Sequence, residues 1–273
     1  MDENYGKYNQ EVPSVFLMIT RLVKSKLDIE NLSRLKTLTP CLESKFSYKG
    51  IIVKKPWGYE YLMFQNKEVA IWILFLRQGH STSMHCHPNK KSSLTVLSGK
   101  IVLYTLEGWY EIKKGGSAMI DEGVFHSSKT TSKEGTLIME IESPPNKKDL
   151  ARLKDNYGRE NLEYEGEDMF TKKKSDYEYV DFHKIKTKGK KRKVIRDCTL
   201  TLSAYFNYSQ TSISQKLKRE SGNLISVLTG ELRQKNGDII LSPPDIALLK
   251  DIQEQPELLA VKDLTYLIIK HDK

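Results

Sequence analysis

Short runs of apolar and β-branched residues dominate the chain from Tyr48 onward. Examples are VAIWILFL at 69–76 and TLIMEIE at 136–142, and glycine-containing turns separate several of the runs. Residues 194–273 hold further runs of the same kind, among them TYLIIK at 265–270. Strands of this length at such spacing are typical of an antiparallel sandwich or barrel. The pattern therefore predicts a mainly β protein with two β domains.

The N-terminal region and the middle of the chain break this pattern. In VFLMITRLVKSKLDIENLSRLKTL, at 15–38, apolar positions recur at intervals of three and four, which predicts a partly helical extension. The basic run HKIKTKGKKRK, at 183–193, predicts a solvated connector, with a nucleic-acid or acidic-surface patch as the alternative. The expected domains are an N-terminal extension (1–50), a first barrel (51–145), a charged connector (146–193) and a second barrel (194–273).

An internal repeat supports two barrels. The segments His80–Gly99 and Thr211–Gly230 align without gaps and end in VLSG and VLTG. A second pair follows in the same order, GGSAMIDEGVFH at 115–126 over GDIILSPPDIAL at 237–248. Two ordered matches favour duplication over chance.

Three histidines are the main candidates for chemistry. His85 and His87 are two residues apart, so on a strand both side chains point to one face. His126 follows on a later expected strand. Three imidazole ligands leave open positions on a transition metal, as catalytic sites do, whereas a lone HxH pair fits a surface or core feature equally well. Cys86 points away from both histidines by alternation and is expected to pack rather than bind.

The spacing around these histidines resembles the two motifs of the cupin superfamily. The first motif aligns with Gly79, His85, His87 and Gly99, and Ser92 stands at its glutamate position. The second aligns with Gly115, Gly123 and His126, with Asp121 for its proline and Thr130 for its asparagine. This resemblance implies tandem double-stranded β-helix (jelly-roll) barrels, a bicupin. It also implies one divalent transition metal (Zn, Fe, Mn or Ni) on three histidines.

Two flanking segments narrow the resemblance. KPWGYE at 55–60 and DLARLKDNYGR at 149–159 are similar to segments of the cupin domain of type II mannose-6-phosphate isomerases and related sugar-metabolism cupins. Those isomerases carry QxH and a glutamate where this chain has His85, His87 and Ser92. The resemblance therefore implies the sugar or nucleotide-sugar branch rather than one reaction.

The expected function is isomerisation or epimerisation of a phosphorylated or nucleotide-linked sugar. Glu140 and Glu142 share a strand face, so either is a candidate base if that face is interior, and both are solvated charges if it is exterior. Lys91 and Arg152 are candidate contacts for an anionic sugar, with a solvated surface role as the alternative. Two other functions stay open: a three-histidine Fe(II) dioxygenase and a non-catalytic sugar-binding cupin.

In the second copy, the repeat places Lys216, Lys218 and Leu248 at the three histidine positions. Lysine ammonium groups have no lone pair to give a metal, and leucine cannot ligate. We therefore expect one metal per chain, in the first barrel only, and expect both lysines to reach solvent or meet an anion.

Composition and charge bear on the expected substrate, partners and cellular location. The 273 residues are 38% hydrophobic and carry a formal net charge of +9, which suits an anionic substrate. Three dispersed cysteines without a CxxC motif favour a reducing cytoplasm. The N-terminus lacks the pattern of a signal peptide, and no run reaches membrane length. Neither a nucleic-acid partner nor a membrane is expected, and the resemblance implies a homodimer.

Overall fold

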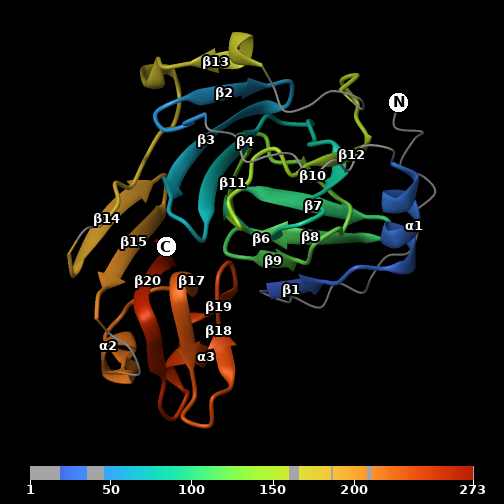
Figure 1. Cartoon of the computed structure of the whole chain (residues 1–273). Helices are drawn as coiled ribbons and strands as arrows, with labels where there is room; N and C mark the ends of the chain where they lie inside the picture. Colours follow the sequence, from blue (N-terminus) through green and yellow to red (C-terminus); the bar gives the residue numbers. More distant parts are fainter. Residues whose placement is uncertain (1–18, 36–45, 160–165, 186, 208–210, 273) are drawn as a thin grey trace.

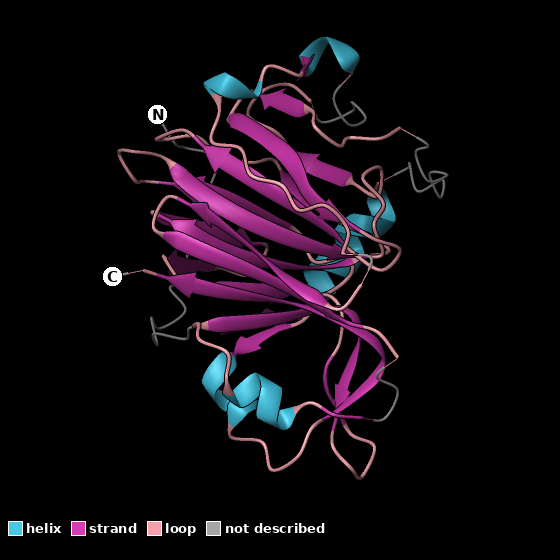
Figure 2. Ribbon diagram, turned by 90° about the vertical axis from the view of Figure 1, so that its left-hand side faces the viewer, coloured by secondary structure: helices cyan, strands magenta, loops and turns pink. Residues whose placement is uncertain are grey.

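The computed structural model describes residues 19–35, 46–159, 166–185, 187–207 and 211–272. About half of these residues lie in strands, and the few helices are short and lie at the periphery (Figure 2). No helix among them is long and apolar enough to cross a membrane.

Two sheets form the first half of the molecule. The larger has the strand order β1-β9-β6-β11-β4-β3-β2-β13, and the smaller has the order β12-β5-β10-β7-β8. All neighbours are antiparallel except β1 and β9. The larger sheet comprises β1 (Ile19–Leu22), β2 (Ile52–Lys55), β3 (Gly58–Gln65), β4 (Ala70–Leu76), β6 (Lys91–Ser98), β9 (Ser117–Ile120), β11 (Thr136–Ser143) and β13 (Phe170–Thr171). The smaller comprises β5 (Met84–Cys86), β7 (Lys100–Thr105), β8 (Trp109–Lys113), β10 (His126–Thr130) and β12 (Ala151–Lys154).

A third sheet, of seven strands, forms the second half. Its main order is β14-β15-β20-β17-β18, with β16 beside β20 and β19 beside β17. The strands are β14 (Gly189–Ile195), β15 (Cys198–Tyr205), β16 (Thr211–Ser212), β17 (Leu224–Arg233), β18 (Ile239–Leu241), β19 (Ile246–Leu248) and β20 (Leu259–His271). The helices of the described chain are α1 (Lys26–Arg34), α2 (Ser214–Lys218) and α3 (Leu249–Gln253), with 3₁₀ turns at Glu167–Met169 and Lys174–Asp176.

The strand pairing of the second half repeats that of the first. β14, β15, β20 and β17 are neighbours in that order, as β3, β4, β11 and β6 are. β17 pairs with β19 near its start and with β18 near its end, as β6 pairs with β9 and β7 with β8. One continuous strand thus takes the place of two. Gly230 within it has φ +74°, close to the +77° of Gly99 between β6 and β7.

Alternation along the central strands divides the core into layers. On β11, Met139 packs in a cluster with residues of β15 and β20, whereas Ile138 packs in a second cluster between the first two sheets. On β4, Ile73 and Trp72 divide in the same way. Both strands are therefore covered on both faces, which explains their nearly continuous apolar sequences. The third sheet is the outer cover, and Figure 1 shows its orange-to-red strands against the cyan-to-green barrel.

The structure corrects two expectations about local structure. Within the helical pattern at 15–38, residues Ile19–Leu22 form strand β1, because they pair in parallel with β9, and only α1 is helical; 15–18 and 36–38 lie outside the described residues. In the expected connector, β14 begins at Gly189 and pairs along its length with β15. The exposed side chains of Lys190, Arg192 and Lys193 suit an edge strand, because charges there discourage pairing with other chains.

Candidate metal centre

Two strands of the smaller sheet bring the three histidines together. His85 lies in β5, His87 follows directly after it, and His126 opens β10, where it pairs with His85 across the antiparallel ladder. The ring centroids are 4.6 Å apart for His85 and His126, 5.1 Å for His85 and His87, and 5.6 Å for His87 and His126. One nitrogen from each ring lies within 4.8 Å of the other two. The predicted trio therefore converges on one point.

Backbone carbonyls fix the tautomer of each ring. The Nδ1 atoms lie 2.8 Å from Ser83 O for His85, 2.7 Å from Asp149 O for His87 and 3.0 Å from Val124 O for His126. A carbonyl can only accept, so each Nδ1 carries the proton and donates it. In the neutral form of each ring, the lone pair is then on Nε2, where a metal can bind it. This outer support is the one that metal-bound histidines ordinarily have.

The chemistry of the donor set fits a transition metal. His87 Nε2 is buried and has no hydrogen-bond partner among the described residues, an unsatisfied acceptor that a metal would satisfy. Burial, with the charge of the neighbouring imidazoles, lowers the pKa of His85 well below 6.5 and that of His126 to about 4. Both rings are therefore neutral near pH 7, the form that binds a metal.

No carboxylate from the glutamate position of the first motif joins the trio. Ser92 stands there, buried opposite Glu142 on β11, and within the described chain its Oγ has no hydrogen-bond partner. Among the described residues, no aspartate, glutamate or cysteine atom completes the group of three imidazoles. Cys86 points to the other face, where it packs with Met84 and Phe125, as alternation predicts.

The two candidate bases both face the barrel interior, but only one is beside the histidines. Glu140 Oε1 lies 3.5 Å from His87 Nε2. Burial alone would raise the pKa of Glu140, but the adjacent imidazole of His87 and the positive charges of Lys147 and Lys90 hold that pKa well below its ordinary value. Glu140 is therefore an ionised carboxylate beside the three histidines.

Glu142 is held in a different network. It accepts a hydrogen bond of 3.0 Å from Trp72 Nε1 and forms a buried ion pair with Lys90 Nζ. Lys90 also donates to Asn146 O at 3.0 Å. Because its oxygens are engaged in this way, Glu142 supports the barrel interior rather than facing the open side of the histidines.

Lys147 is a further cation of the barrel interior, and the sequence pattern did not predict it. Lys147 Nζ lies 2.9 Å from Glu60 Oε1 and 3.7 Å from the centroid of the Trp72 ring. Burial would lower the pKa of Lys147, but Glu60, Glu142 and Glu140 together raise it above its ordinary value. Lys55 also pairs with Glu60, at 3.4 Å. The signal available was the charge of KPWGYE, and only the fold shows that these charges are internal.

The two candidate anion contacts, Arg152 and Lys91, lie in different places. Arg152 on β12 is directly opposite His85 on β5, so its side chain starts from the same sheet face, and it is buried. Lys91 begins β6, where its neighbour Ser92 faces the interior, and its half-exposed side chain pairs with Asp121 at 3.8 Å. The structure therefore brings Arg152 to the site and leaves Lys91 at the surface, because alternation turns Lys91 outward.

No such centre is present among the described residues of the second half. Lys216 and Lys218 lie on α2 instead of a strand, with Lys218 exposed and Lys216 Nζ 5.7 Å from the centroid of the Tyr205 ring. Leu248 packs against the core shared by the larger sheet and the third sheet. The interior of this half is filled by apolar side chains, including Ile225, Leu232 and Ile268.

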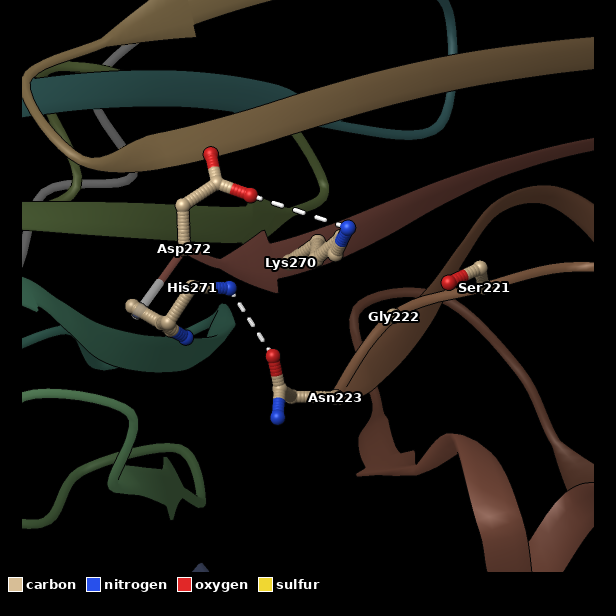
Figure 3. A pocket seen from close by; sticks show the side chains of 6 residues that line it. All are labelled: Ser221, Gly222, Asn223, Lys270, His271 and Asp272. Carbon is tan, nitrogen blue, oxygen red and sulfur yellow. Dashed lines mark hydrogen bonds and ion pairs between the residues drawn. The ribbon is translucent and has the colours of Figure 1, made fainter.

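A separate surface cavity lies at the end of β20. It has a volume of about 300 Å³ and is lined by Ser221, Gly222, Asn223, Lys270, His271 and Asp272. Figure 3 shows Lys270 facing Asp272, and the backbone N–H of His271 donating to Asn223. None of the three metal-centre histidines lines it.

Comparisons with known proteins give partial structural matches only. No protein-family model and no curated protein matches the sequence. KdgF from Halomonas sp. matches 34% of this chain and 83% of its own at 12% identity and a TM-score of 0.32. An RmlC-like cupin from Shewanella frigidimarina matches 37% of this chain and 92% of its own at 16% identity and a TM-score of 0.32. CapF, a capsular polysaccharide assembling protein from Staphylococcus aureus, matches 38% of this chain and 34% of its own at 16% identity and a TM-score of 0.35.

Each match covers a minor part of the chain, so the fold assignment rests on strand pairing and motif positions. Two facing sheets enclose an apolar core, and the HxH pair and the later histidine lie on neighbouring strands of one of them. Gly79, Gly99, Gly115 and Gly123 all have positive φ at the expected turns. The first half of the chain therefore has a double-stranded β-helix fold, the fold that the cupin-like motif spacing implies.

Proposed function

We propose that the protein is a metal-dependent cupin that isomerises or epimerises a phosphorylated or nucleotide-linked sugar. The observation that carries the proposal is an open set of three converging histidines with one carboxylate, Glu140, beside them. His85, His87 and His126 would hold the metal. When bound, it supplies polarisation of a substrate carbonyl or hydroxyl oxygen.

Glu140 is the group that moves the proton. Aldose–ketose isomerisation and epimerisation both remove a proton from a carbon next to a polarised oxygen, which needs a base within hydrogen-bond reach. Glu140 is buried and lies 3.5 Å from His87 Nε2, on the interior face of β11. Glu142 is engaged by Trp72 and Lys90, so we assign the base to Glu140 alone.

Arg152 is the proposed contact for the anionic part of the substrate. Its guanidinium can bind a phosphate through two parallel N–H groups, a geometry that lysine lacks. Its place opposite His85 brings the anion to the side of the centre where His85 is partly exposed. The interior charges of Lys147 and Lys90 make the rest of the barrel polar, which suits a polyhydroxyl ligand.

A thermal-shift screen of the zinc-, iron-, manganese- and nickel-loaded protein against sugar phosphates and nucleotide sugars tests the proposal. A true ligand raises the midpoint in proportion to RT ln(1 + [L]/Kd). We expect at least one ligand that the protein converts without oxygen. Arg152→Ala should weaken the binding of that ligand. Lys91→Ala is the matched control and should leave binding unchanged.

Two outcomes of the same screen would support other functions. The absence of a carboxylate at Ser92 also suits a three-histidine Fe(II) dioxygenase, and oxygen consumption by the iron-loaded protein alone would favour that activity. Tight sugar binding without turnover across the panel would favour a non-catalytic sugar-binding cupin.

A further inference from the structure

We propose that the N-terminal segment Ile19–Leu35 is part of the metal centre, and that Asp28 on α1 is the residue that positions the third ligand, His126. The inference rests on the metal site of the proposed function, but on no assumption about the substrate or the reaction.

Asp28 uses its two carboxylate oxygens for two different tasks. Oδ2 accepts hydrogen bonds from the backbone N–H and the hydroxyl of Ser25, each 2.8 Å long, and so closes the cap of its own helix. Oδ1 accepts the backbone N–H of Phe125 at 2.9 Å, 97 residues further along the chain. Asp28 is 3% exposed, so its bond to Phe125 does not compete with water.

Phe125 is the residue directly before His126. Its ring is fully buried with Met84, which precedes His85, and with Cys86, which lies between His85 and His87. Leu32 and Leu35 at the end of α1 pack against the same cluster. The helix therefore packs on the side of β5 and β10 that faces away from the histidines.

The segment before the helix ties down the rest of the loop that leads to His126. β1 runs beside β9, and the N–H of Asp121 donates to Leu22 O at 3.0 Å. Gly123 N–H donates to His87 O at 2.8 Å, and a Cβ added at Gly123 would meet Lys24 Cε at 2.5 Å. Loop 121–125 is thus held between the N-terminal segment on one side and a ligand residue on the other.

Helix capping alone would not explain the buried bond to Phe125. A capping aspartate satisfies N–H groups of its own helix and is ordinarily solvent-exposed. Here one carboxylate oxygen accepts a hydrogen bond from outside its own helix and so fixes the backbone next to a ligand. An outer-shell residue that orients a metal-bound histidine has this role. The two tasks can be separated, because Ser25 takes part only in the cap.

The test compares Asp28→Ala with Ser25→Ala in the full chain. Both variants remove part of the cap, and only Asp28→Ala removes the bond to Phe125. Two quantities are measured: the Kd for cobalt(II), with its visible absorption spectrum, and the hydrogen-exchange rate of the Phe125 amide in the metal-free protein. His87→Ala serves as the variant without a complete centre.

We expect Asp28→Ala to raise the cobalt Kd at least about tenfold, to change the ligand-field bands and to expose the Phe125 amide. Ser25→Ala should keep the Kd within about twofold and the spectrum unchanged. Asp28→Asn, which keeps the side-chain shape but has a single carbonyl oxygen, should give a Kd between the two, and it serves if Asp28→Ala fails to fold.

Three results would overturn the inference. A wild-type Kd and spectrum in Asp28→Ala, or in Asp28→Asn if only that variant folds, would show that the bond does not position His126. An equal loss in Ser25→Ala would show that only the cap matters. A wild-type protein that binds cobalt no better than His87→Ala would remove the metal site itself, and with it both proposals.

Discussion

At the residue scale, the two glutamates of β11 should respond differently to the same substitution. Glu140→Gln removes the proposed base, so turnover should fall about 10²- to 10⁴-fold while metal content stays unchanged. Glu142→Gln leaves Lys90 as a buried unpaired charge and should cost about 3–5 kcal/mol of unfolding free energy. Metal analysis, turnover and denaturant titration measure the three effects. Full turnover in Glu140→Gln would exclude it from proton transfer.

Alternation along strands predicts which residues of the site share a face. It places His85 and His87 on one face, turns Cys86 away, and puts Glu140 and Glu142 together. It does not show that the shared face of the two glutamates is interior, nor that Lys90 forms an ion pair with one of them. Lys147 and Asp28 are not predicted from the sequence because their partners lie far along the chain.

His85 and His126 should make the metal-free protein less stable as the pH falls below neutral. Their pKa values are lowered in the folded state, to about 4 for His126, so near pH 5 the unfolded chain binds more protons than the folded one. The free energy of unfolding must then rise with pH between about 5 and 6.5. Urea titrations at pH 5, 6 and 7 measure this slope, and His126→Leu should reduce it. A slope that this substitution leaves unchanged would argue against the buried neutral state.

At the element scale, the long apolar runs became strands, and the errors came from segments whose partners decide their structure. Ile19–Leu22 fits a helical pattern but pairs with β9. GKKRKVI, at 189–195, has the basic composition of a solvated connector but forms the edge strand β14. The repeat alignment aligned Lys216 with a strand residue, whereas α2 replaces that strand, with Leu217 buried in the core of the second half. The composition of each segment alone could not predict which strand it pairs with or what it packs against.

Gly230 and Gly237 in the second half should differ in how strongly an alanine substitution destabilises the protein. Gly230 has φ +74°, and an added Cβ would meet Asp263 O at 2.5 Å and Val261 O at 2.7 Å. Gly237 has φ +96°, but nothing lies within 4 Å of its added Cβ. Gly230→Ala should therefore destabilise the protein by more than Gly237→Ala, which carries only the backbone penalty of about 1 kcal/mol. Equal shifts in denaturant midpoint would contradict the close approach of β20 to Gly230 of β17.

At the scale of the whole molecule, the second half covers the outer face of the first barrel. Met139 and Ile73 share a core with Leu200 and Leu267. Polar contacts fasten the halves, including Asn66 Nδ2 to Leu228 O at 2.9 Å. This intramolecular sheet contact occupies the face on which a second chain could pair, so a homodimer, still a prediction, would need another surface.

The central claim is a single three-histidine metal centre in the first barrel, and metal content per chain tests it most directly. The protein should be purified without a histidine tag, loaded with each candidate divalent ion, desalted and analysed by mass spectrometry. We expect close to one bound ion per chain for the preferred metal, almost none in His87→Ala, and no change in Cys86→Ser. Two ions per chain, or one ion retained in His87→Ala, would contradict the account.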